Sequence, residues 1–238
     1  MRSALTDDPW LSSQMGLPCY QLQHVDFLTT ELQEEISRLL LKRSFITAKV
    51  PSTSVKFVGQ LEDMGFRIAD TAITLEADML ATQFDSRFTV RDAKSSDQPR
   101  IEEIAKHSFE FTRFHLDPRI DRATASKVKA QWATNFFSGQ RGDFMVVAER
   151  DDIVCGFCQL LLEDSAKVLT IDLIAVDKSH RGSGAATAMI HFSPSSHGAS
   201  RRRVSTQVAN ISSLRLYEKA GYRIAQSTYI LHAHGPEN

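Results

Sequence analysis

The seven residues from Ser179 to Ala185, Ser-His-Arg-Gly-Ser-Gly-Ala, have the composition of a loop that binds phosphate. Glycine lets the backbone approach a ligand closely, and the first N–H groups of a helix have no acceptor within that helix. The donors of such a loop would be the N–H groups of Arg181, Gly182, Ser183, Gly184 and Ala185. A glycine pair after a strand can also serve only to turn the chain, so the sequence alone allows either a phosphate-binding loop or a simple turn here.

The segments around this loop suggest how it is positioned. The preceding run from Val168 to Val176 is dominated by Val, Ile and Leu and predicts a buried strand. The helix that should begin at the loop is expected to kink or end near Phe192, because Pro194 removes a hydrogen bond and costs roughly 3 kcal/mol. Further on, the pattern predicts a strand at 204–208, a turn at Asn210 and a short helix at 212–220.

Together these two segments resemble the GNAT superfamily of acetyl-coenzyme A-dependent N-acetyltransferases. The pyrophosphate loop of that family is commonly written [Gln/Arg]-x-x-Gly-x-[Gly/Ala]. Gly182 and Gly184 occupy its last two fixed positions, but Ser179 stands where the family has Gln or Arg. The resemblance implies acetyl-coenzyme A as cosubstrate, bound by the loop and by Asn210. Ser179 is expected to weaken this binding, although it leaves the backbone donors intact.

The resemblance also implies catalytic roles. The reaction requires an uncharged amine, support for a developing oxyanion and protonation of the departing thiolate. Family precedent gives the last role to Tyr217, and it assigns the oxyanion to the N–H groups of a bulged strand at Ile174, Ala175 and Val176. Asp172 could act as a base through water. Each assignment has a structural alternative: Tyr217 as a packed aromatic, Asn210 as a helix cap and Asp172 as a paired carboxylate.

An irregular aromatic segment at 109–119 contains four candidate residues for binding the acceptor: Arg113, His115, Asp117 and Arg119. Arginine can bind two phosphate oxygens at once. The run from Phe114 to Pro118 and the end of the chain resemble bacterial nucleotide-sugar N-acetyltransferases, which implies a nucleotide-linked amino sugar as acceptor. Three alternatives stay open: a solvated loop here, another amine acceptor such as a different small molecule or a protein N-terminus, and a non-catalytic acyl-coenzyme A sensor, suggested by Ser179 and Pro194.

The amino-acid composition bears on the kinds of partner that the protein binds. The 238 residues carry 28 basic and 29 acidic side chains, so no global charge favours nucleic acid or an anionic membrane. The run 201–203, Arg-Arg-Arg, is expected to be a solvated helix end. No apolar stretch approaches the roughly 20 residues that span a bilayer, and the N-terminus lacks a signal peptide's apolar region. We therefore expect a cytoplasmic protein without membrane or nucleic-acid partners, and the sequence is compatible with a homodimer.

Cys155 and Cys158 have the spacing of a redox or metal motif. The surrounding pattern predicts a strand, on which residues three apart face opposite sides. No second cysteine pair is present to complete a zinc site. We therefore expect structural cysteines and no metal.

The order of predicted elements indicates an α/β protein with a mixed sheet. Residues 1–85 should form a smaller N-terminal α/β domain, which begins with a polar stretch and continues with a helix at 28–41 and strands at 45–50 and 66–75. Residues 86–238 should form a GNAT acetyltransferase domain. Its expected elements are a strand at 88–92, helices at 98–108 and 123–137, two strands that meet near Arg150, and the segments described above, ending in a strand at 223–232.

Overall fold

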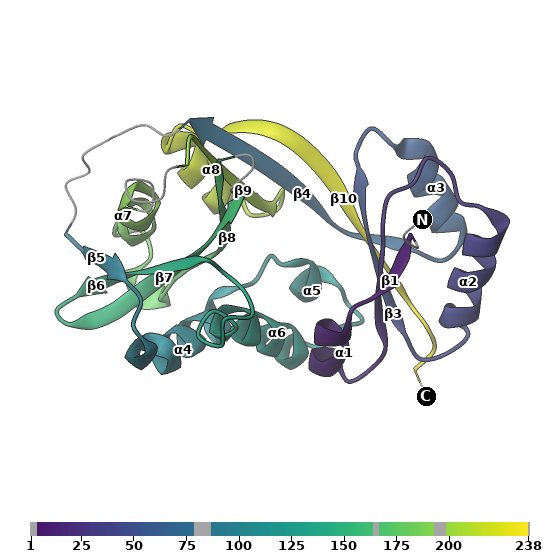
Figure 1. The fold of residues 1–238 in the computed structure, drawn as a ribbon, viewed down its shortest axis with the longest axis horizontal. Helices are drawn as coiled ribbons and strands as arrows, with labels where there is room; N and C mark the ends of the chain where they lie inside the picture. The colour runs from purple at the N-terminus through teal and green to yellow at the C-terminus, as the bar shows by residue number, and fades with distance from the viewer. Residues whose placement is uncertain (1–3, 79–86, 164–166, 193–198, 238) are drawn as a thin grey trace.

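A computed structural model describes residues 4–78, 87–163, 167–192 and 199–237, which form one ten-stranded sheet with helices on both faces (Figure 1). The strands are β1 Leu5–Asp7, β2 Cys19–Leu22, β3 Phe45–Pro51, β4 Arg67–Asp78, β5 Thr89–Asp92, β6 Phe144–Arg150, β7 Ile153–Glu163, β8 Val168–Val176, β9 Arg201–Gln207 and β10 Arg223–His234. The α-helices are α1 Pro9–Met15, α2 Thr30–Leu40, α3 Val55–Asp63, α4 Gln98–Ser108, α5 Arg113–Leu116, α6 Arg122–Thr134, α7 Ala185–Phe192 and α8 Ile211–Lys219. This arrangement confirms the expected mixed α/β fold.

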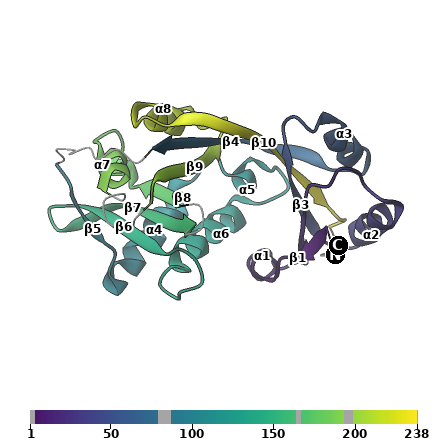
Figure 2. The same cartoon turned by 45° about the horizontal axis from the view of Figure 1, so that its top comes forward.

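The sheet order is β1-β2-β3-β10-β4-β9-β8-β7-β6-β5. Strands β5 to β8 form an antiparallel meander, whereas β8 and β9 are parallel neighbours. A strand from the first part of the chain, β4, lies between β9 and β10 and pairs antiparallel with both. Figures 1 and 2 show β4 and β10 as long strands that run together from one half of the molecule to the other.

The expected N-terminal and C-terminal blocks are therefore joined by one sheet. The C-terminal strand β10 pairs with β3, so residues near both ends of the chain contribute to the N-terminal core. The expected boundary at residue 85 lies outside the described residues, and the division into two domains stays a prediction.

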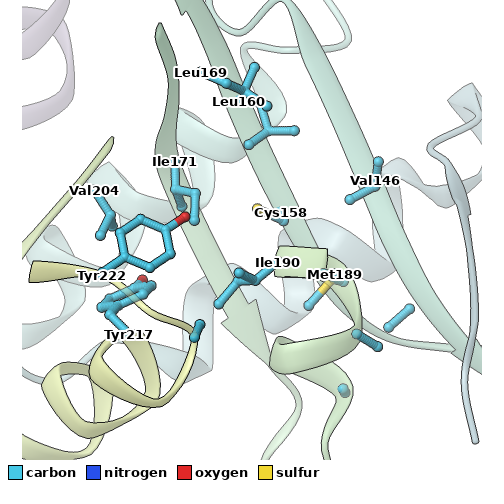
Figure 3. Packing of buried hydrophobic residues seen from close by; sticks show 14 of the residues in the cluster. Val146, Cys158, Leu160, Leu169, Ile171, Met189, Ile190, Val204, Tyr217 and Tyr222 are labelled. Carbon is cyan, nitrogen blue, oxygen red and sulfur yellow. The ribbon is translucent and has the colours of Figure 1, made fainter. Parts of the chain in front are cut away.

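Two hydrophobic layers enclose the C-terminal half of the sheet. Neighbouring residues of β7 divide between them: Cys158 packs with α7 and α8 on one face, and Phe157 packs with α4 and α6 on the other. Figure 3 shows part of the first layer, in which Tyr217 and Tyr222 lie against the strands that carry Ile171 and Val204. Helices α2 and α3 pack on the N-terminal half around a separate cluster.

Several expectations at the level of single segments are wrong. The first 28 residues are not just a polar stretch, since they contain β1, α1 and β2. The run Arg201–Arg203 begins strand β9 rather than ending a helix, and Arg202 is buried with its guanidinium 5.0 Å from the Tyr222 ring. The predicted irregular segment at 109–119 includes the short helix α5.

The two cysteines of the Cys-Gly-Phe-Cys run are free thiols, as expected, but their predicted orientation is wrong. A register shift between Ala148 and Glu149 leaves Cys155 as an extra residue in β7. Because a bulge interrupts the alternation of side chains, Cys155 and Cys158 lie in the same cluster instead of on opposite faces.

Helix α7 ends at Phe192 in the described part of the chain, and the Ser-Pro segment expected to interrupt it lies outside the described residues. None of the described helices combines the length and apolar character needed to cross a membrane.

The placement of β4 predicts that a residue of the first block supports the C-terminal core. Leu75 is fully buried and pairs with Val204 of β9 and with Ile224 of β10. Replacing Leu75 by Ala should lower the free energy of unfolding by about 2–5 kcal/mol, because it leaves a cavity in the core beneath α7 and α8. Urea unfolding followed by circular dichroism would measure this loss.

The matched control is Ile68→Ala on the same strand, because Ile68 is 45% exposed. We expect that variant to lose less than about 1 kcal/mol. Equal losses in the two variants would contradict the contribution of β4 to the C-terminal core.

Candidate active site

The central feature of the site is the divergence of two parallel strands. β8 and β9 pair from Val168 with Arg201 as far as Ile171 with Val204. Beyond that point β8 continues to Val176 and β9 to Gln207 without pairing to each other. Backbone groups on the facing edges are consequently open to an extended ligand between the strands.

A cavity of 210 Å³ lies at this divergence. It brings together five of the residues that the sequence predicted for cofactor binding: Ile174, Ala175, Val176, Arg181 and Asn210. The remaining wall comes from the end of α4 and the segment after it, from α7, from β9 and from the first turns of α8; its residues are Ser108, Phe109, Glu110, Phe111, Thr112, Ala186, Gln207, Ser212, Ser213 and Leu216. Gly182, Ser183, Gly184 and Ala185 are not wall residues, but they connect Arg181 to Ala186, which are.

The glycine loop has the backbone conformation that its sequence requires. Gly182 and Gly184 have φ angles of 73° and 99°, a region that L-residues with a Cβ rarely adopt. The N–H groups of Gly182, Ser183 and Gly184 have no acceptor within the described part of the chain. Helix α7 begins directly afterwards at Ala185, so its positive N-terminal end faces the same loop.

Ser179 contributes to the loop in a different way from the long polar residue of the family pattern. Its N–H and hydroxyl donate to Asp177 Oδ1 at 2.9 and 2.5 Å. Asp177 also accepts from Arg100, and these hydrogen bonds, led by that from Ser179, lower the pKa of its carboxyl to about 2. Ser179 thus stabilises the start of the loop from within, and the N–H donors that follow do not depend on its side chain.

Arg181 anchors the wall of the cavity. Its guanidinium donates to the carbonyl of Val176 at 3.3 Å and to that of Ser108 at 3.1 Å, which ties the end of β8 to the end of α4. Among the described residues no carboxylate lies within ion-pair distance of it. Its positive charge is therefore available to an anionic ligand.

The proposed cap at Asn210 is confirmed, because its Oδ1 accepts from the N–H of Ser213 at 3.2 Å at the start of α8. Asn210 also borders the cavity, so the cap and a contact with a ligand are compatible.

Tyr217 lies behind this cavity rather than on its wall. The side chain is 2% exposed, and its ring centroid lies 5.5 Å from that of Tyr222. Burial, with a smaller contribution from Cys158, raises the pKa of the phenol well above its usual value. The hydroxyl is accordingly held in its neutral form, and the same cluster contains Ile171 and Val204, the last pair before the strands diverge.

Asp172 has the structural role that the sequence left open. A register shift between Gln159 and Leu160 leaves Asp172 as the extra residue of a bulge in β8. Its carboxylate accepts from Trp132 Nε1 at 2.8 Å, from Gln159 Nε2 at 3.1 Å and from Arg141 at 2.5 and 2.7 Å. An acidic side chain that is 7% exposed and receives four hydrogen bonds is a paired structural carboxylate.

A second cavity, of 490 Å³, lies between the N-terminal strands and α6. Its positive charges are Lys49 on β3, Arg113 on α5 and Arg141 after α6; its single carboxylate is that of Asp8. The other lining residues are Trp10, Leu11, Gln21, Leu22, Gln23, Thr47, Trp132, Asn135 and Gln140. The cavity thus combines cations, amides and indole rings.

The cations of this second cavity are incompletely neutralised. Arg141 is paired with Asp172, but no carboxylate of the described residues lies within ion-pair distance of Lys49 or Arg113. Burial lowers the pKa of Arg113 to about 10, and burial together with Arg113 and Arg141 lowers the pKa of Lys49. Lys49 is exposed and Arg113 is half-buried, and neither has a carboxylate partner, so the cavity carries uncompensated positive charge that suits an anionic ligand.

The structure separates the four residues expected to bind the acceptor. Only Arg113 lines the second cavity. His115 lies 2.7 Å from the Thr112 hydroxyl at the start of α5, and Arg119 donates to the carbonyl groups of His234 and Gly235. Sequence reasoning missed Lys49 and Arg141; the signal for Lys49 was a lysine within the apolar strand 45–50.

Asp117, the fourth of these residues, belongs to a buried cluster with two histidines of β10. Its Oδ2 lies 2.7 Å from His232 Nδ1 and 2.7 Å from His234 Nε2. Burial favours the neutral carboxyl, but the hydrogen bonds from the two imidazoles outweigh it and hold the pKa of Asp117 below its usual range. The three donor atoms lie within 4.8 Å of one another, as a bound cation would require, yet hydrogen bonds already satisfy this carboxylate.

Residues 99–222 match the model of the acetyltransferase (GNAT) family. Because that match covers more than half of the chain, the chain belongs to this family.

Individual relatives agree with that assignment. The chain is 30% identical to the spore coat polysaccharide biosynthesis protein SpsD of Bacillus subtilis over 148 residues, which are 61% of this chain and 50% of SpsD. The match therefore spans half the length of that curated relative.

Two solved structures share the fold. A GCN5-related N-acetyltransferase from Sphaerobacter thermophilus aligns over 99% of this chain and 79% of its own, with a TM-score of 0.62 and 13% identity. A protein of unknown function from Staphylococcus epidermidis aligns over 99% and 93%, with a TM-score of 0.71 and 11% identity. At these identities the likeness shows the fold alone.

The conformation of the glycine loop leads to a test of its role. Gly184→Ala should weaken acetyl-coenzyme A binding by about 5- to 30-fold, because a Cβ at a φ of 99° strains the loop by roughly 1–2 kcal/mol. Isothermal titration calorimetry would measure the change. The control is Gly65→Ala, at a φ of 92° between α3 and β4, which should keep the wild-type affinity. Equal affinity in all three proteins would contradict phosphate binding by this loop.

Proposed function

We propose that the protein transfers an acetyl group from acetyl-coenzyme A to the primary amine of a nucleotide-linked amino sugar. One observation supports this most directly: two consecutive residues line the two cavities, one each. Thr112 lines the cavity at the divergent strands, and Arg113 lines the basic cavity. An acetyl donor in the first and an anionic acceptor in the second would therefore approach each other at the start of α5.

The chemistry of the second cavity favours this acceptor over a simple amine. A nucleotide sugar carries two negative charges on its diphosphate, and Lys49 and Arg113 are cations without carboxylate partners. The indole rings of Trp10 and Trp132 offer apolar surface for a base or a sugar ring. The name of SpsD refers to polysaccharide synthesis, and the sequence also resembles dTDP-fucosamine acetyltransferase; both agree with a sugar acceptor.

The residues of the first cavity have the groups that acyl transfer needs. Acetyl-coenzyme A supplies an activated thioester. The unpaired edge of β8 at Ile174–Val176 offers N–H donors to the thioester carbonyl as its oxygen gains negative charge. Arg181 and the loop N–H groups hold the phosphate end, which fixes the distance between the acetyl group and the acceptor amine.

The acceptor assignment predicts a preference for the nucleotide-linked form. Transfer to a UDP-linked or dTDP-linked amino sugar should have a kcat/KM at least about 100-fold above that for the free amino sugar, because the diphosphate contacts are lost in the latter. Lys49→Met should raise the KM for the nucleotide sugar by roughly 10-fold and change kcat little, as expected for the loss of one charge-assisted contact. Steady-state release of coenzyme A would measure both effects.

Lys42→Met is the matched control, since Lys42 is exposed just before β3 and lines neither cavity. That variant should behave as wild type. Equal kcat/KM values for the free and the nucleotide-linked sugar would contradict the proposed acceptor.

Tyr217 is proposed to support the departing thiolate by hydrogen bonding. Its raised pKa makes complete proton transfer more unfavourable than in water, so we expect donation without ionisation. Tyr217→Phe should keep acetyl-coenzyme A affinity within about 2-fold while kcat falls by about 10- to 1,000-fold. An unchanged kcat would contradict this role. A wild-type protein that binds acetyl-coenzyme A but acetylates no amine would instead indicate a sensor.

A further inference from the structure

The acetyl-transfer reaction releases one proton from the acceptor amine, and Asp172, the base candidate from the sequence, is already fully hydrogen-bonded. The acceptor amine loses a proton when its nitrogen forms the new bond to the acetyl carbon. Asp172 already receives four hydrogen bonds, and Tyr217 is buried in its protonated form. A group near both cavities is needed for this step.

Lys129 on α6 lines neither cavity itself, but its amine contacts an aromatic side chain of each. Its Nζ is 4.4 Å from the centroid of the Trp132 ring and 5.5 Å from that of Phe109. Trp132 lines the basic cavity and Phe109 lines the cavity at the divergent strands. The amine therefore lies between an aromatic side chain of each cavity, close to where the two substrates would meet.

The charges around this amine come from several elements. Arg113 on α5, Arg141 after α6 and Lys49 on β3 oppose a further positive charge there, and Asp172 on β8 favours it. Burial and nearby cations, Lys129 among them, lower the pKa of the neighbouring His115. Among the described residues no carboxylate lies within ion-pair distance of Lys129 Nζ. A lysine that is largely enclosed, unpaired and surrounded mainly by cations is unusual for a purely structural side chain.

The surroundings of Lys129 also lower the pH at which its amine loses a proton. Burial, followed by the charge of Arg113, lowers the pKa of Lys129 to about 7. A substantial fraction of the amine is then neutral near neutral pH, whereas an ordinary lysine is almost fully charged. The two aromatic faces attract the ammonium form, so the side chain can also hold a proton once it has accepted one.

We infer that Lys129 is the general base that accepts the proton of the acceptor amine. This inference rests on the proposed function. As the C–N bond forms and the C–S bond breaks, the proton moves from the amine nitrogen to Lys129 Nζ and from there to solvent. The sulfur leaves as coenzyme A thiolate, which takes up its own proton separately, so atoms and charge balance.

The test compares the pH dependence of kcat in the wild type and in three variants, with acetyl-coenzyme A and UDP-glucosamine or a dTDP-linked amino sugar as substrates. Wild-type kcat should rise with pH through an apparent pKa near 7, because the neutral amine is the active form. Lys129→Met and Lys129→Arg should both lower kcat at pH 7 by about 100-fold or more and abolish that inflection. Lys127→Met, on the same helix but exposed, is the control and should keep it.

Arginine keeps the positive charge but cannot act as a base, so it separates this role from simple attraction of an anion. If Lys129→Arg retains wild-type kcat, or if Lys129→Met raises only KM, the inference is overturned. NMR titration of 13C-methylated lysines gives a measurement that does not depend on turnover. A methyl resonance whose chemical shift titrates with a midpoint near pH 7, and which is lost in Lys129→Met, supports the inference. A Lys129 pKa near 10 overturns it.

Failure of the proposed function would be seen separately, as a wild-type protein that transfers acetyl to no amine. Normal transfer with an unchanged pH profile in Lys129→Met would overturn only the inference about Lys129.

Discussion

The separation of β8 from β9 beyond Ile171 and Val204 is the constraint on which the rest of the site depends. Parallel strands normally continue their ladder, so unpaired edges inside a sheet must be stabilised by other contacts. On one side the bulge at Asp172 is held by Arg141, Trp132 and Gln159. On the other side β9 is paired to β4 as far as Gln207. The same carboxylate that shapes β8 also positions Arg141 at the second cavity, so the two cavities share one structural element.

The distant parts of the chain are needed for this geometry. β4 comes from the first block, yet it supports β9 from the side opposite the opening and contributes Leu75 to the core beneath α7 and α8. β3 contributes Lys49, and α1 contributes Trp10, to a cavity whose other wall is α6. The N-terminal segment thus completes both the sheet and the acceptor side of the site, while the glycine loop and α8 complete the cofactor side.

Local sequence patterns predicted the elements that depend on local physics. The apolar run of β8, the amphipathic helix α8 with its cap at Asn210 and the helix that opens at the glycine loop all follow from neighbouring residues. Contacts between distant segments were not predictable in this way. Asp172 could be identified as a paired carboxylate only from the structure, which places Arg141 beside it. The structure likewise shows that Lys49 lines a cavity, because β3 lies opposite α6. Arg201–Arg203 was misread because its partners, Glu76 and Glu163, lie far away in sequence.

Hydrogen exchange at the open edge of β8 tests the central claim most directly. The amides of residues 172–176 should exchange readily in the free protein on the edge that faces β9, because β9 no longer pairs with them there. Saturating acetyl-coenzyme A should slow exchange in the peptide that contains these residues, and leave the peptide that covers α2, at the far end of the sheet, unchanged. Protection confined to other segments, or none in this peptide at saturation, would contradict binding between the divergent strands.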